Sequence, residues 1–190
     1  MLIPLSSCEQ EPLSLADTKL HLRVDHDDED TLISVLIQVA RQQAEHRTGR
    51  VLLHSQLQCV LDGFSPLLEL TCLPVQAVQS IYWRDGKEVW HTLDTDAYRV
   101  YLDGLPALIA PHKPWPQAVG MQSVKIDLIA GYASPAQVPA PLRQWMLLTI
   151  GALYTQREGL AGGGLASPAQ YQIPRAFYGG LLDPYLIPRV

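Results

Sequence analysis

The sequence predicts an α+β protein in which helices from the two ends of the chain form one helical domain, interrupted by an antiparallel β region. Apolar residues follow a helical period up to about residue 50, a period of two from residue 51 to about residue 130, and a helical period again up to residue 159. Strands grouped between helices, rather than alternating with them, are typical of this class. A chain of 190 residues that is 47% hydrophobic can bury a sizeable core.

Two helices are expected in the first 50 residues. Ser14 is a candidate N-cap for a short helix over "LADTKLHL", with Asp17 three residues later as a weak capping box. A second helix should begin near Asp27 or Asp28, continue through "DEDTLISVLIQVARQQAEHRT" and end at Gly49. Acidic residues therefore come first in this helix and basic residues last, as the helix dipole favours.

The stretch "HLRVDHDDED", residues 21–30, is rich in carboxylates and histidines, which suits either a metal site or a helix start. Carboxylates at a helix N-terminus accept hydrogen bonds from free backbone N–H groups. Counted from Asp25 as a calcium-binding loop, the stretch has Asp30 where Gly is needed and Leu36 where Glu is needed. His21 and Asp25 could meet across one turn, but we interpret the stretch as a helix start and expect no metal.

The middle of the chain contains six segments with strand character. They are "VLLHSQLQCVLDGF", "AVQSIYW", "EVWHTL", "AYRVYL", "ALIA" and "SVKIDLIAGY". Asp85 and Gly86, between the second and third segments, predict a tight hairpin turn with positive φ angles. We expect an antiparallel sheet or small barrel of about five to seven strands.

A third long helix should begin near Pro141 and run through "LRQWMLLTIGALYTQRE" to Gly159. Both long helices are apolar over much of their circumference, so we expect them to pack together and to leave an apolar face for a neighbouring subunit. These changes of period divide the chain into an N-terminal helical segment (1–50), a β insertion (51–138), a C-terminal helix completing the helical domain (139–159) and an extended tail (160–190).

The tail has no period and is rich in glycine and proline, yet it carries many apolar side chains. Such a segment is expected to dock on another surface. The candidate docking residues are Tyr171, Phe177, Tyr178, Leu181, Leu182 and Tyr185.

Charge and cysteine content exclude several classes of protein. The net charge of −5 disfavours sequence-independent binding of DNA. Neither a membrane-spanning run nor a signal-peptide pattern is present, so we expect a cytoplasmic protein. Cys8, Cys59 and Cys72 are odd in number and widely spaced, which indicates free thiols, at least two of them buried, rather than disulfides or a zinc site.

Catalysis is the first alternative to a structural role. His54, His91 and His112 could pair with an acidic residue of the β region as an acid–base or metal site, the candidates being Asp94, Asp96 and Asp103. The sequence has no nucleophile-elbow, zinc-protease or phosphate-loop motif, so we expect neither an enzyme nor a cofactor.

A second alternative is a DNA-binding packaging factor. It would use Arg41, Arg47, Arg50 and Arg143, although these arginines can equally cap helices or pair with carboxylates. Trp83 and Trp90 are expected to pack within the sheet. Trp115, between two prolines, is the tryptophan most expected to be exposed, and we assign it to a possible intersubunit or tail-side contact.

Several motifs resemble those of the head-tail connector proteins of tailed bacteriophages, in the subgroup with a β insert between its helices. The motifs are "LRVDHDDED" before the second helix, "HRTGR" after it, "AGY" followed by "VPAPLR", "YTQRE" at the end of the late helix, and "LLDPY" near the terminus. The resemblance covers nearly the whole chain. Family members commonly have a basic residue directly after that last tyrosine, where this chain has Leu186.

The resemblance implies a structural protein of the virion neck, assembled in the host cytoplasm. It implies a homo-oligomeric ring that attaches beneath the portal protein, extends the DNA exit channel and offers a platform to the next neck or tail component. DNA would pass through the channel without sequence-specific binding and no membrane would be involved. An acidic chain suits such a conduit, because a lining that repels phosphates lets DNA slide.

Overall fold

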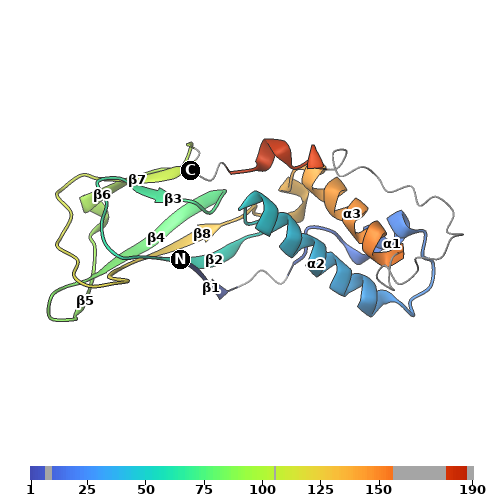
Figure 1. Cartoon of the computed structure of the whole chain (residues 1–190), viewed down its shortest axis with the longest axis horizontal. Coiled ribbons are helices and arrows are strands. Elements are labelled where there is room, and N and C mark those ends of the chain that lie inside the picture. The colour runs from blue at the N-terminus through green and yellow to red at the C-terminus, as the bar shows by residue number, and fades with distance from the viewer. Residues whose placement is uncertain (7–9, 105, 156–178, 188–190) are drawn as a thin grey trace, which may run out of the picture.

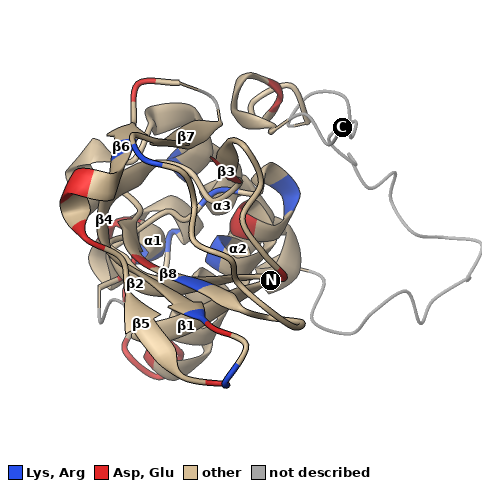
Figure 2. Cartoon of the chain, turned by 90° about the vertical axis from the view of Figure 1, so that its left-hand side faces the viewer, with Lys and Arg blue, Asp and Glu red and all other residues tan. Residues whose placement is uncertain are grey.

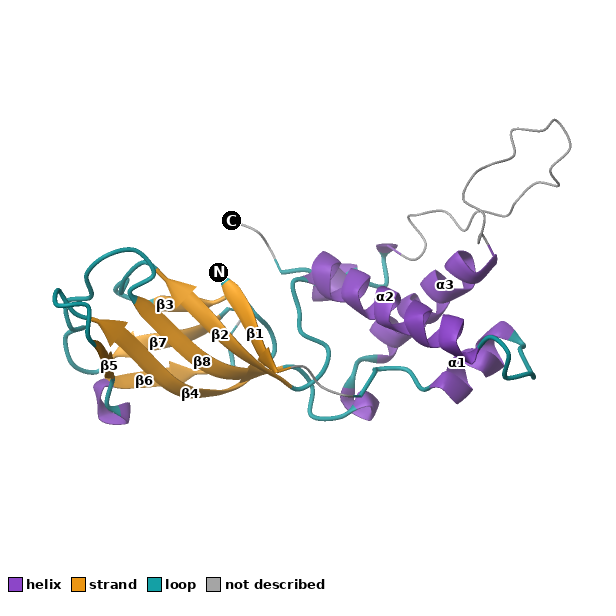
Figure 3. Ribbon diagram, turned by 90° about the horizontal axis from the view of Figure 1, so that it is seen from below, coloured by secondary structure: helices purple, strands orange, loops and turns teal. Residues whose placement is uncertain are grey.

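The computed structural model describes residues 1–6, 10–104, 106–155 and 179–187. The molecule is elongated, with the helices at one end and the strands at the other (Figures 1 and 3). We call these parts the helical lobe and the β lobe. The predicted α+β class is confirmed, whereas the domain boundaries predicted from the periods stay predictions.

Among the described residues, three α-helices form the helical lobe: α1 (Leu15–Leu22), α2 (Asp30–Thr48) and α3 (Ala140–Thr155). The predicted cap of α1 is confirmed, because the Ser14 hydroxyl oxygen accepts a hydrogen bond from the Asp17 N–H at 3.0 Å. The predicted end of α2 is also confirmed. Gly49 has a φ of 70° and donates its N–H to the Glu45 carbonyl oxygen at 2.8 Å.

The core of the helical lobe lies between α2 and α3. Inward-facing residues of α2 recur with helical spacing and pack against one face of α3, and all are buried: Ile33, Ile37, Ala40 and Ala44 from α2, and Leu142, Trp145, Met146 and Ile150 from α3. The outer face of α2 is less covered. Leu32 and Val35 on that face remain 37% and 49% exposed.

Eight strands in the described part of the chain form two antiparallel sheets (Figure 3). The larger sheet has the order β1-β2-β8-β4-β5 and the smaller sheet β3-β7-β6. The strands are β1 (Leu2–Ser6), β2 (Ser55–Leu61), β3 (Leu68–Leu70), β4 (Val75–Arg84), β5 (Trp90–Thr92), β6 (Tyr98–Tyr101), β7 (Ala107–Pro111) and β8 (Val124–Ala130). Short 3₁₀ turns span Thr95–Ala97, Pro135–Gln137 and Asp183–Tyr185.

The core of the β lobe lies between the two sheets, where alternate residues of β8, β7 and β4 point inward. Ile81, Ile109, Ile126 and Leu128 are fully buried there. Cys59 and Cys72 join this core as free thiols, as predicted, and Cys8 lies outside the described residues. Burial raises the pKa of the Cys72 thiol to about 11.

Strand β1 was not predicted, because its sequence contains Pro4. It forms at the edge of the larger sheet, where a missing N–H is tolerated. Its pairing is anchored by the chain terminus, because the Met1 amino group donates to the Val60 carbonyl oxygen and the Val60 N–H donates back to Met1. β3 was missed as well, since three residues are too few to show a period.

The predicted hairpin between β4 and β5 is confirmed, but its turn differs from the prediction. Neither Asp85 nor Gly86 has a positive φ, and the left-handed residue is Glu88, with a φ of 64°. The reason is the Asp85 carboxylate, which accepts the N–H groups of Lys87 and Val89 at 2.8 and 3.0 Å. These bonds stabilise a longer turn than the two-residue type.

Candidate functional site: the C-terminal segment at the lobe junction

The acidic stretch before α2 forms ion pairs instead of capping the helix. Helix α2 begins at Asp30, and the residue in the cap position, Glu29, makes no capping bond with its side chain. Its carboxylate instead accepts a hydrogen bond from the Tyr154 hydroxyl. Lys19 contacts Asp27 at 2.5 Å and Asp30 at 2.7 Å, so the stretch links α1 to the start of α2. The hydrogen bond with Lys19 is the main cause of the lowered pKa of Asp27.

The histidines considered for catalysis are not brought together with the predicted acids. His91 contacts Asp85 at 2.9 Å and stacks on Trp83 with the ring centroids 4.7 Å apart. His54 and His112 are both exposed. The His91 bond and the backbone N–H groups lower the pKa of Asp85 to about 2, so this pair stabilises the hairpin turn. Among the described residues, no three His, Cys, Asp or Glu side chains are grouped as metal ligands.

The described part of the predicted tail, residues 179–187, packs against the helical lobe. In the segment 179–187, Leu182 is 3% exposed and belongs to the core between α2 and α3, while Leu181 and Tyr185 pack around it. Tyr171, Phe177 and Tyr178 lie outside the described residues. Leu182 therefore contacts its own subunit, and the docking of the other predicted tail residues on a partner stays a prediction.

Arg50 holds this C-terminal segment at the junction of the two lobes. Its Nε donates to the Tyr185 carbonyl oxygen at 2.8 Å, and its guanidinium lies 5.7 Å from the centre of the Tyr185 ring. The next contact follows at Ile187, whose N–H donates to the Thr48 carbonyl oxygen at 3.2 Å. The Ile187 side chain packs on the β-lobe core. The segment 179–187 thus contacts the cores of both lobes.

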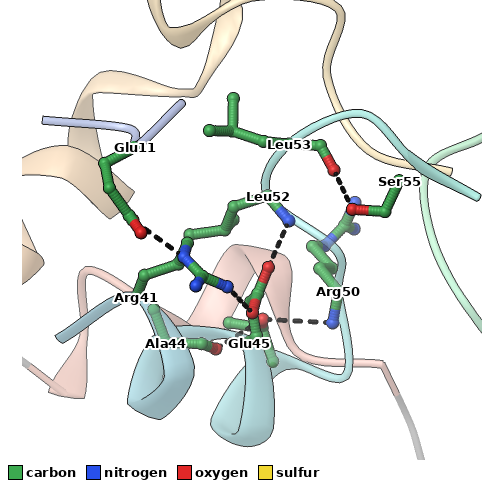
Figure 4. Close-up of polar contacts among 9 residues, drawn as sticks. Glu11, Arg41, Ala44, Glu45, Arg50, Leu52, Leu53 and Ser55 are labelled. Atoms are coloured by element: carbon green, nitrogen blue, oxygen red, sulfur yellow. Dashed lines mark hydrogen bonds and ion pairs between the residues drawn. The ribbon is translucent and has the colours of Figure 1, made fainter. Parts of the chain in front are cut away.

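A polar network fixes the linker that leaves α2 toward the β lobe (Figure 4). Arg41 bonds to Glu11 at 2.8 Å and to Glu45 at 2.9 Å. The other oxygen of Glu45 accepts the Leu52 N–H at 2.9 Å. Burial is the main cause of the raised pKa of Glu45, which these bonds partly offset.

The returning linker crosses close to the first. The His54 N–H donates to the Tyr132 carbonyl oxygen at 3.0 Å. At Gly131, whose φ is 98°, a Cβ would lie 2.2 Å from the Leu53 carbonyl oxygen, so only glycine fits this crossing. The junction therefore consists of two crossed linkers and the C-terminal segment.

The predicted exposure of the tryptophans is wrong: Trp115 is half-buried within its own subunit, whereas Trp90, which was expected to pack within the sheet, is 39% exposed. Its ring stacks on Phe64 with the centroids 4.7 Å apart, and its Nε1–H donates to the Ser65 carbonyl oxygen at 2.8 Å. Its predicted contact with another subunit stays a prediction. Arg50 is the residue that sequence reasoning missed at this site. It stands in the "HRTGR" motif, but no local pattern connects it with a tyrosine 135 positions later.

Comparison with known proteins points to one family. Residues 12–93, which include α1, α2 and strands β2 to β5, match the family model of phage gp6-like head-tail connector proteins. No curated protein matches the sequence. In the described part of the chain, no helix has the length and apolar character needed to cross a membrane.

Solved structures share the fold of the whole chain. A chain in the neck of an empty gene transfer agent particle, computed with C6 symmetry, has 22% sequence identity and a TM-score of 0.80, with 100% of this chain and 97% of that chain covered. Chains from the virion of the native gene transfer agent particle and from its neck, computed with C12 symmetry, give TM-scores of 0.78 and 0.77 at the same identity and coverage.

Proposed function

We propose that this chain is a head-tail connector protein and a structural subunit of a virion neck. The match of residues 12–93 with the phage gp6-like family model supports this proposal. The observation that carries this proposal is that the fold of a neck-particle chain extends over the full length of the protein. The subunit forms a ring beneath the portal, extends the DNA exit channel and presents a surface to the next neck or tail component. It acts in the assembled particle, after assembly in the host cytoplasm.

Ring formation is supported by the exposed apolar surface of the helical lobe. A ring needs two different patches on each subunit, since each copy meets one neighbour with one patch and the other neighbour with the second. The outer face of α2 offers one candidate, with Leu32 and Val35 exposed. The C6 and C12 symmetries belong to the matched neck structures, and the number of copies in this ring is left to experiment.

The DNA-binding alternative is weakened by the positions of the arginines. Arg41 is bonded to two carboxylates, and Arg50 is bonded to the C-terminal segment. Arg47 lies over the Trp145 ring at 5.5 Å, and the Nε of Arg143 is buried. These side chains hold the helical lobe together, so they do not form a free basic surface for phosphates.

The size of the purified protein in solution, followed by class averages of negatively stained particles, tests this proposal. Rings with a central hole, formed alone or on addition of the portal protein, are the expected result. A protein that stays monomeric in the presence of the portal would contradict the proposal. A DNA-binding factor would instead shift duplex DNA in a salt-dependent manner.

A further inference from the structure

Two loops are joined at the end of the β lobe farthest from the helices (Figure 1). They are the β4–β5 turn and the segment 119–123 that leads into β8, and Arg84 connects them. The Arg84 carbonyl oxygen accepts the Val119 N–H at 3.0 Å, and its Nη2 donates to the Met121 carbonyl oxygen at 2.9 Å. Gly120 allows this approach, because a Cβ there would lie 3.0 Å from the same Nη2. The two loops therefore have a fixed relative position.

These loops expose a group of apolar side chains, which we call the distal patch: Val89, Trp90, Val119 and Met121. Their exposed fractions are 50%, 39%, 43% and 77%. The loops approach each other closely, since a Cβ on Gly86 would lie 3.9 Å from the Val119 side chain. Apolar side chains that gather on a rigid surface, rather than being scattered singly, are typical of interaction sites.

Three cationic residues, Arg84, Lys87 and Lys125, lie around the distal patch, at the end of the β lobe that faces the viewer in Figure 2, where acidic residues are present as well. The Lys125 ammonium lies 4.4 Å and the Arg84 guanidinium 5.7 Å from the centre of the Trp90 ring. Within the part of the chain that the structure describes, Arg84, Lys87 and Lys125 form no ion pair, in contrast to Lys19 and Arg41.

Three carboxylates, those of Asp62, Asp85 and Glu88, also lie near the patch, but in the part of the chain that the structure describes none of them forms an ion pair with these cations. Asp85 is engaged by His91 and by the backbone of the turn, and Asp62 accepts the Gln122 N–H at 2.9 Å. Glu88 is the remaining acidic side chain of the turn. Three unpaired cations around an apolar surface favour a partner that brings both carboxylates and apolar side chains.

We propose that the distal patch binds an acidic, apolar protein segment of the next neck or tail component. The proposal rests on the proposed function, because it assigns this end of the subunit to that component. A protein partner is favoured over nucleic acid, because the side chains of Met121 and the two valines can neither donate a hydrogen bond to a phosphate nor pair with its charge. Apolar anchors inside a charged rim are typical of protein interfaces.

The test uses heads that lack this chain, loaded with the purified full-length protein and then mixed with purified tails. Two variants alter the patch: Val119→Ser combined with Met121→Ser, and Lys125→Glu. Two matched controls change exposed residues elsewhere on the β lobe: Leu67→Ser, at a side chain 40% exposed, and Lys113→Glu. We expect both patch variants to remain on the heads while tail joining falls by about tenfold or more, and the controls to join tails normally.

Each other outcome has a separate meaning. If the serine variant joins tails normally, the inference is overturned, even if the Lys125→Glu variant does not join tails. The contact would then depend on charge alone, as a contact with DNA phosphates would. Loss of the patch variants from the heads also overturns it, since the patch would then face the portal. If the unmodified protein does not attach to heads, the proposed function itself fails.

Discussion

Substitution of Leu182 by alanine tests whether the C-terminal segment belongs to the fold of the subunit. Leu182 is 3% exposed in the core between α2 and α3, so its truncation removes buried apolar contacts and leaves a cavity. Buried Leu→Ala substitutions cost about 2–5 kcal/mol. The segment lies at the surface of the lobe, where neighbours can partly fill the space, so we expect the lower half of that range, about 2–3 kcal/mol.

The matched control is Leu186→Ala, four positions later in the same segment, where the leucine is 45% exposed. We expect this change to alter the free energy of unfolding by less than about 0.5 kcal/mol. Urea unfolding followed by circular dichroism measures both variants, and equal m-values would show that the comparison concerns stability alone. If Leu182→Ala costs no more than its control, the segment does not pack on its own helices and the reasoning is refuted.

Three further predictions concern the β lobe and the junction. Because the pKa of Asp85 is lowered from 3.8 to about 2, its carboxylate stabilises the hairpin above pH 3.8, and this contribution is lost as the pH falls toward 2. Hydrogen exchange of the Val89 amide should therefore become faster in acid in the unmodified protein, and this dependence on pH should be lost in Asp85→Asn. Gly131→Ala should destabilise the protein by about 3 kcal/mol or more, whereas Gly63→Ala, with open space around its Cβ, should be nearly neutral in thermal unfolding. In a Cys8→Ser background, Cys72 should resist a thiol reagent at pH 8 until the protein is unfolded, and rapid labelling of the native protein would contradict its burial.

Local signals in the sequence were sufficient for much of the fold. The bounds of α1, its Ser14 cap and the Gly49 end of α2 depend on residues within one turn of each other, so they could be predicted without the tertiary structure. Strand β1 could not be predicted in this way, because an edge strand containing Pro4 is stabilised by its partner β2 rather than by its own residues. The position of the positive φ at Glu88 depended on which backbone groups the Asp85 carboxylate would accept.

The candidate site was less predictable than the fold. Periodicity and composition indicate that a side chain will be buried, but they do not say against which surface. The apolar tail residues were therefore expected to dock, and the sequence could not show that Leu182 would enter the core of its own helical lobe. The distal patch is likewise created by tertiary contacts, since Arg84 joins loops more than 30 residues apart in sequence.

Reconstruction of the neck in the particle to which this chain belongs tests the central claim most directly. We predict a closed ring of copies of this subunit directly below the portal, with a continuous channel at its centre and the end of each β lobe that carries the distal patch turned toward the tail. A neck without density for this fold, or the protein located elsewhere in the particle, would contradict the account.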